Sequence, residues 1–159
     1  MTTTAVRIPR AVPSRDRDVM DEHMRVTPRR GGVPPRPEDA YRVGVMRRIA
    51  AARLRYFRLE AMTDDVMLIV SELLTNALLH SGTTEIGLNL TVGDGTLRIT
   101  VTDGMPGSAT PKQVTDNAES GRGLVLVEAL VEKSGGDWGT SDSGAETWCS
   151  LPVPAEIRS

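Results

Sequence analysis

The sequence predicts an α+β fold, a two-layer α/β sandwich in which a mostly antiparallel sheet carries helices on one face. Two observations support this. Alternating, β-rich segments occur in pairs joined by short turns, which is typical of hairpins. Three segments with apolar residues at helical spacing are interspersed with them. A sheet and amphipathic helices bury their apolar faces by packing together, and 159 residues are enough for one such domain.

The N-terminal segment, residues 1–37, is rich in arginine and proline and poor in large apolar residues, so we expect a flexible tail with a short strand near 24–27. Residues 1–60 hold 14 Arg and 7 acids (net +7), whereas 61–159 hold 5 basic and 14 acidic residues (net −9). A docking arm is the alternative, although aromatic residues suited to single-stranded nucleic acid are lacking. Deleting 1–34 is expected to leave nucleotide affinity within a few-fold.

The first predicted helix spans 38–58 and begins the main domain, 38–154. Glu38 and Asp39 lie in its first turn, where acidic side chains suit the helix dipole. Its apolar stripe consists of Val43, Met46, Ile49, Ala50, Leu54 and Phe57. Its other side carries Arg42, Arg47, Arg48, Arg55 and Arg58. The stripe should be buried, so truncation beyond Phe57 should unfold the domain.

The second predicted helix runs from Asp64 to His80 and ends at the Ser-Gly pair 81–82. Glu72, Asn76 and His80 are spaced i, i+4, i+8 and therefore share one face. Their neighbours are apolar, so these polar groups must bond within the protein or face a polar ligand. One interpretation is a half-solvated polar edge. The other is a metal–nucleotide site, because an amide oxygen suits Mg²⁺ and a carboxylate can act as general base.

A hairpin is predicted from 85–92 and 96–102 around the turn 93–95. Its second strand runs into Asp103, whose carboxylate can accept a hydrogen bond from an amino group; the alternative is an ordinary Asp-Gly turn. The polar composition of 108–120 predicts a mobile loop.

A third helix is predicted over 122–133, introduced by Ser120-Gly121-Arg122-Gly123-Leu124. Glycines at a helix start can let free N–H groups bind phosphate, and the alternative is a flexible helix start. A closing hairpin, 136–140 and 147–151, follows, with a short tail at 155–159.

Together these segments resemble the GHKL ATPase superfamily, the histidine-kinase, gyrase, Hsp90 and MutL type. More narrowly, they resemble stand-alone bacterial proteins related to anti-sigma-factor serine kinases. The resemblance covers about 40–152. It is carried by Val70-Ser71-Glu72-Leu73-Leu74-Thr75-Asn76-Ala77 and His80, by Asp103 with Gly107, and by Gly121-Arg122-Gly123-Leu124 followed by Val127-Glu128-Ala129-Leu130.

The resemblance implies a Bergerat-type fold that binds ATP and Mg²⁺, with 108–120 as a lid. It implies that Asn76 holds Mg²⁺, that Glu72 is the catalytic base, and that Asp103 accepts from the adenine amino group. Gly107 would let the base approach. The implied nucleotide-binding set is Asn76, His80, Asp103, Gly107, Gly121, Arg122, Gly123 and Leu124.

Two positions depart from the family pattern. Met105 replaces a glycine after Asp103, and Glu146 occupies the position where relatives have threonine. Glu146 is unhelpful if it points into the pocket, unless Thr147 takes over that contact. Three functions therefore stay open: a serine protein kinase acting on a small antagonist protein, a non-catalytic ATP-dependent switch that sequesters a partner, and a simple ATPase.

Other classes of function lack their motifs. No Gly-Lys dipeptide occurs, which excludes a Walker P-loop. Cys149 is the only cysteine, so no internal disulfide can form, and we expect it in the core. No apolar run reaches membrane-spanning length and no signal peptide is recognisable, so we expect a cytoplasmic protein. The expected partner is a protein, an antagonist or a sigma factor; a homodimer is an alternative, and neither membrane nor direct nucleic-acid binding is expected.

Overall fold

The computed structural model describes residues 17–27, 34, 36–80, 83–103, 118–141 and 145–154, without the side chains of 80 and 118–123. The elements follow the order β1 (Arg17–Arg25), α1 (Pro37–Tyr56), the 3-10 helix η3 (Glu60–Met62), α2 (Thr63–His80), β2 (Glu85–Gly93), β3 (Thr96–Thr102), α4 (Ala118–Ser134), β4 (Asp137–Thr140) and β5 (Glu146–Pro152). No helix within these ranges is long and apolar enough to cross a membrane.

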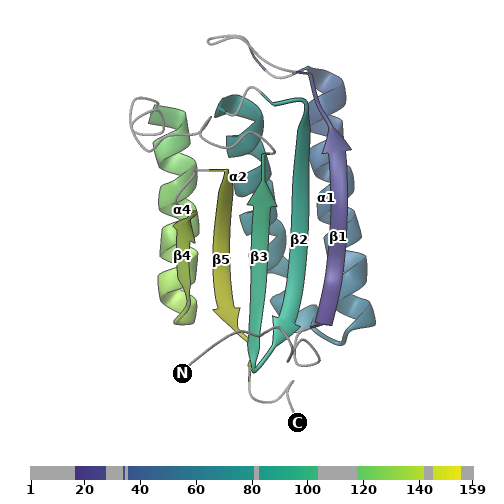
Figure 1. The fold of residues 1–159 in the computed structure, drawn as a ribbon. Helices are drawn as coiled ribbons and strands as arrows, with labels where there is room; N and C mark the ends of the chain where they lie inside the picture. Colours follow the sequence, from purple (N-terminus) through teal and green to yellow (C-terminus); the bar gives the residue numbers. More distant parts are fainter. Residues whose placement is uncertain are drawn as a thin grey trace, which may run out of the picture.

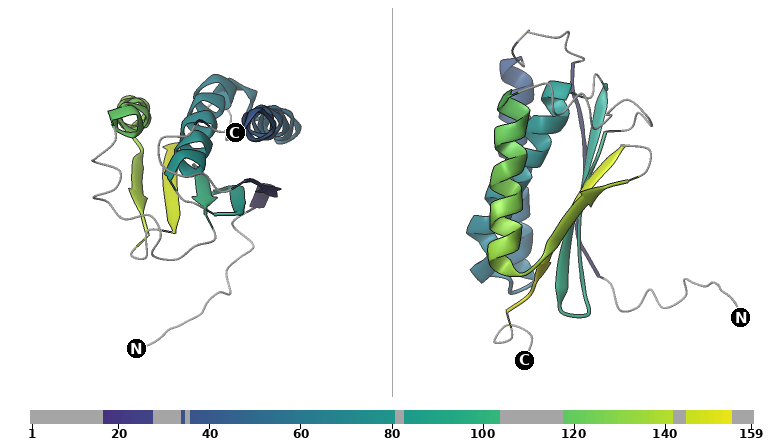
Figure 2. Two further views of the ribbon diagram at one scale, coloured as in Figure 1. Left: turned by 90° about the horizontal axis from the view of Figure 1, so that it is seen from above. Right: turned by 90° about the vertical axis from the view of Figure 1, so that its left-hand side faces the viewer.

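The strands form one sheet in the order β1-β2-β3-β5-β4 (Figure 1). Every neighbouring pair is antiparallel. The side view in Figure 2 shows all three α-helices on one face of this sheet and none on the other. The predicted α+β two-layer sandwich is therefore confirmed.

The core lies between the two layers and follows the alternation of the strands. On β2, Ile86, Leu88 and Leu90 are buried, and on β3 the buried residues are Leu97, Ile99 and Val101. Register pairs Leu88 with Val101 and Leu90 with Ile99, so these side chains share the face that the helices cover. Cys149 on β5 is paired with Ile99 and is buried there as expected. Burial raises the pKa of its thiol to about 12.

The helices match their predicted positions to within a few residues, except at the start of α4. Val43, Met46, Ala50 and Leu54 of the α1 stripe are buried, and Ile49 and Phe57 pack partly against the core. The chain leaves α1 through Arg58, whose φ of 63° is left-handed. This allows the N–H of Leu59 to donate to the carbonyl of Leu54 at 2.7 Å. η3 then turns the chain into α2.

The expectation of a flexible tail over 1–37 is wrong for residues 17–27. Arg17–Arg25 form β1, which pairs with β2 at the edge of the sheet. The segment contributes four buried apolar side chains: Val19, Met20, Met24 and Val26. Composition pointed to disorder because these residues are few, yet each has a place in the core.

Polar contacts to α1 also hold this segment. Asp39, only 2% exposed, accepts a hydrogen bond from the N–H of Thr27 at 3.0 Å. Nε of Arg53 donates to the carbonyl of Val19 at 2.6 Å. The strand is therefore joined to both ends of α1 by contacts between residues far apart in sequence, which local composition does not reveal.

The start of the third helix also differs from expectation. α4 begins at Ala118, not at residue 122, so Ser120, Gly121 and Gly123 belong to its helical backbone. Of the lid expected over 108–120, residues 108–117 lie outside the described part of the chain, and 118–120 are helical.

Candidate functional site

Three predicted segments meet at one end of the molecule. The C-terminal end of α2, the end of β3 and the start of α4 lie at the same end of the sandwich (Figure 1). α2 and α4 run antiparallel, since Asp65 near the start of α2 and Ser134 at the end of α4 line one shallow hollow at the opposite end. The fold thus brings together three segments that are spread over the 38 positions from His80 to Ala118.

α2 supplies the polar row, which consists of Glu72, Asn76 and His80. Leu73, Leu74 and Leu78 are buried and hold the helix against the sheet and its neighbours. Glu72 and Asn76 are half-buried on the same flank of the helix. A half-buried position shields a side chain from part of the solvent while leaving access for a ligand. His80 is the last residue of α2, and its side chain is outside the described part of the structure.

Asp103 directly follows β3 and is 5% exposed. Its backbone N–H donates to the carbonyl of Ala145 at 2.9 Å, which continues the β3–β5 pairing one step past the strand end. This contact fixes the backbone at Asp103. Met105 and Gly107 lie outside the described residues, so the expected approach of a base at Gly107 stays a prediction.

The start of α4 supplies backbone rather than described side chains. Leu124 packs partly against the core, and Val127 and Val131 are buried, which anchors the helix. In an α-helix only the N–H groups of the N-cap and of the first three helical residues lack an intrahelical acceptor. Gly121 is the fourth residue of α4 and Gly123 is the sixth, so both lie past this set. A phosphate contact through the N–H of either glycine therefore requires the first turn of α4 to open.

The strand alternation places Glu146 and Thr147 on opposite faces of the sheet. Cys149 and Leu151 are buried on the helix-facing side, and Thr147 shares their face because side chains alternate along β5. Glu146 is exposed on the other face. The acidic departure from the family pattern therefore points away from the helix layer, and Thr147 is the residue that faces it.

Sequence reasoning missed one contact beside the polar row. Arg47 was expected on the solvent side of α1, but it is half-buried, and its Nη1 donates to Oγ of Ser71 at 3.0 Å. Its Nε is buried without a hydrogen-bond partner in the described structure. Ser71 immediately precedes Glu72, so this bond ties α1 to the turn of α2 that carries Glu72. The available signal was that position 47 lies on the flank of the stripe, next to Met46.

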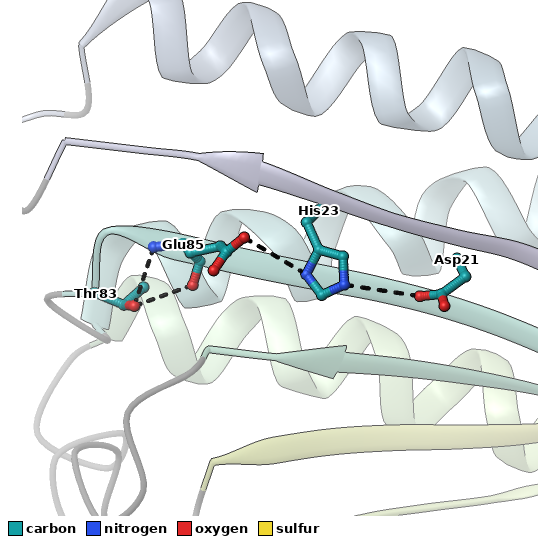
Figure 3. Close-up of polar contacts among 4 residues, drawn as sticks. All are labelled: Asp21, His23, Thr83 and Glu85. Atoms are coloured by element: carbon teal, nitrogen blue, oxygen red, sulfur yellow. Dashed lines mark hydrogen bonds and ion pairs between the residues drawn. The ribbon is translucent and has the colours of Figure 1, made fainter.

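His23, expected alone in a tail, stands on β1 between two carboxylates (Figure 3). Its Nε2 lies 3.9 Å from Asp21 and its Nδ1 lies 3.9 Å from Glu85. The ring covers Gly87, where an added Cβ would lie 3.1 Å from it. Oγ1 of Thr83 exchanges hydrogen bonds with the backbone of Glu85 and holds the start of β2.

This cluster does not form a metal centre. The two carboxylates approach different ring nitrogens of His23, so the three groups do not converge on one point. The described residues contain no group of three or more His, Cys, Asp or Glu side chains that could hold a metal ion. A cation at the site formed by α2, β3 and α4 would therefore need ligands in addition to such side chains.

Two comparisons with known proteins gave a match. The sequence profile of the histidine kinase-like ATPase domain matches residues 33–150, which is most of the chain. A similar solved structure is the histidine kinase domain from Erythrobacter litoralis EL346 blue-light activated histidine kinase, with 23% identity and a TM-score of 0.46. The match covers 76% of this chain and 63% of that domain. No curated protein sequence matches the chain. On the strength of the profile match, the chain belongs to the histidine kinase-like ATPase domain family.

Proposed function

We propose that the protein is a Mg-ATP-binding regulatory protein, and that its activity is that of a serine protein kinase of the anti-sigma type. The observation that carries the proposal is the convergence of α2, the end of β3 and the start of α4 at one end of the fold. In this proposal Glu72, Asn76, Asp103 and the start of α4 form one nucleotide site. Each of these groups suits a different part of a nucleotide.

The residues present fit a cation that arrives with the nucleotide. Mg²⁺ in proteins is commonly held by one or two side-chain oxygens together with substrate phosphates. The half-buried amide of Asn76 supplies such an oxygen, and the described residues contain no ready-made cage of metal ligands. When bound, Mg²⁺ would neutralise charge on the phosphates. Gly121 and Gly123 would donate their N–H groups to phosphate oxygens once the first turn of α4 opens.

Asp103 would distinguish adenine from guanine. A buried carboxylate at a fixed strand end accepts a hydrogen bond from the exocyclic amino group of adenine, and guanine presents a carbonyl at the same position. Two acceptors facing each other without a proton leave a buried group unpaired, which costs about 1–3 kcal/mol. ATP should therefore bind at least several-fold more tightly than GTP.

Glu72 would perform the proton transfer. Its carboxylate would take the proton from the hydroxyl of an acceptor serine while that oxygen attacks the γ-phosphorus. The bond from the γ-phosphorus to the bridging oxygen breaks, and ADP leaves. Phosphoryl transfer depends mainly on positioning and charge neutralisation, so a small set of side chains is sufficient. The acceptor would be a serine on a small antagonist protein in the cytoplasm.

The departure at Glu146 slightly favoured the non-catalytic switch, because an acidic side chain facing the nucleotide would be unhelpful. The alternation of β5 turns Glu146 to the opposite face of the sheet and brings Thr147 to the helix side. This orientation answers the objection from Glu146, and we favour the kinase over both the switch and a simple ATPase.

The test compares three variants on α2 by calorimetric titration and turnover. Asn76→Ala should weaken Mg-dependent ATP binding, whereas Glu72→Gln should bind ATP normally and lower turnover about 10²-fold or more. Thr75→Ala, exposed on the same helix, serves as the matched control and should change neither. Wild-type protein that binds neither Mg-ATP nor Mg-ADP would refute the nucleotide site. Normal turnover in Glu72→Gln would refute the assignment of the base.

A further inference from the structure

The outer face of α1 combines exposed aromatic rings with positive charge. Tyr41 and Tyr56 are 67% and 75% exposed, the two highest values among the large hydrophobic side chains of the described residues. α1 also carries five arginines against two acidic residues: Arg42, Arg47, Arg48, Arg53 and Arg55 against Glu38 and Asp39. Tyrosine and arginine are the side chains most enriched at the energetic centres of protein interfaces.

Three of these arginines already have partners inside the fold. Arg42 contacts the carboxylate of Asp39 and the carbonyl of Arg25. Arg47 and Arg53 donate to α2 and to β1, respectively. These three guanidinium groups hold α1 in place and are therefore not counted as available to a partner protein.

Arg48 and Arg55 differ from the other three. Both are exposed, and neither takes part in an ion pair within the described part of the chain. They are seven residues apart, so they lie on the same outer side of the helix, about 10 Å from each other. The face thus presents two uncompensated cations at a defined spacing.

The Arg48 end of this face is preorganised. The guanidinium of Arg48 lies 5.8 Å from the centre of the Tyr41 ring, within the range of a cation–π contact. Its Nη1 is 3.5 Å from the position that a Cβ on Gly44 would occupy, so the side chain runs back along the helix over the glycine. A ring and a cation already held together lose less conformational freedom on binding.

We propose that the outer face of α1, formed by Tyr41, Arg48 and Arg55, docks an acidic helical segment of a partner protein. Two carboxylates one heptad apart on that segment would match the spacing of Arg48 and Arg55, and an apolar side chain one heptad beyond the carboxylate at Arg48 would cover the Tyr41 ring, because Tyr41 lies seven residues before Arg48. Charge complementarity selects an acidic occupant. A nucleic acid is disfavoured because the chain as a whole carries a net charge of −2, and residues after 60 carry −9, which repels phosphates.

The test measures binding of a labelled peptide by fluorescence anisotropy, without nucleotide, at about 0.1 M salt, where the Debye length is about 10 Å. The probe is an alanine-based helical peptide with two Glu residues seven positions apart and a Leu seven positions outside this pair. The comparison probes are the same peptide with Gln for Glu and a single-stranded oligonucleotide. Because nucleotide is absent, the outcome is independent of the proposed ATP site.

The variant is R48E/R55E, and the matched control is R98E/K133E, which makes the same change in net charge at exposed positions on β3 and α4. We expect wild-type protein to bind the Glu peptide, the α1 variant to lose at least tenfold in affinity, and the control to stay within about twofold. The milder variant R48Q/R55Q adds no acidic charge and should give an intermediate loss of affinity. It replaces R48E/R55E as the test variant if the charge reversal disturbs folding.

Three results would overturn the proposal. Wild-type protein that fails to bind the Glu peptide, or binds the Gln peptide as well, shows that carboxylates are not recognised. Equal losses in the two double variants show that only net charge matters. Tighter binding of the oligonucleotide than of the Glu peptide identifies the face as a nucleic-acid surface.

Discussion

Removing residues 1–34 is expected to unfold the domain, although sequence composition predicts that this deletion is harmless. The deletion takes away β1, which pairs with β2 along most of its length. It also removes four buried apolar side chains, Val19, Met20, Met24 and Val26. On β2, Ile86 and Leu90 would then lose their register partners Met24 and Met20 at the edge of the sheet.

The size of the effect follows from this burial. Burying one large aliphatic side chain stabilises a protein by about 1.5–3 kcal/mol, so the four side chains of the 17–27 segment together contribute roughly 6–12 kcal/mol. This is an upper estimate because the unfolded chain already buries part of that surface. A domain of this size is stable by only about 5–15 kcal/mol. The loss of β1 therefore consumes most of the stability of the fold.

The assay is urea denaturation followed by circular dichroism, with ATP titration of the same samples. The control is deletion of 1–16, which removes none of the described residues and should leave the midpoint nearly unchanged. We expect the 1–34 deletion to show no cooperative transition and no ATP binding. A 1–34 deletion that unfolds cooperatively within about 1 kcal/mol of the intact chain would refute the reasoning from burial.

Three further predictions concern single positions. Asp39→Ala should destabilise the domain by about 1–3 kcal/mol in the same assay, because the N–H of Thr27 loses its buried acceptor; an unchanged midpoint would contradict this. Gly136→Ala should lower the melting temperature, because the new Cβ would lie 1.9 Å from the carbonyl oxygen of Ser150 and force the backbone apart; a melting temperature equal to wild type would show that β4 can shift freely. Cys149 should resist thiol reagents at pH 8 until the protein is denatured, since burial raises its pKa from 9.0 to about 12. Because the folded pKa is the higher one, this thiol's contribution to stability is complete below about pH 9 and is lost as pH rises toward about 12; rapid labelling of native protein would contradict its burial.

Local pattern was sufficient for the architecture and for most element positions. Apolar spacing in α1 and α2 and alternation along β2 and β3 indicate which side of each element is buried. The turn around Asp94 marks where β2 ends and β3 begins. These signals are local because a helix or strand repeats its facing residues every few positions. The family could be assigned for the same reason, since its three motifs are short and contiguous.

The tertiary structure decided what depends on contacts between distant residues. β1 is a strand because Val19 and Met24 have places in the core and because Asp39 and Arg53 hold its backbone, none of which composition records. The face of the sheet on which Glu146 lies depends on the register of β5. A slip of one residue would move every side chain of the strand to the opposite face. Sequence by itself determined the residue types and their order; packing determined which of them meet, because long-range burial and register are properties of the assembled sheet rather than of any segment.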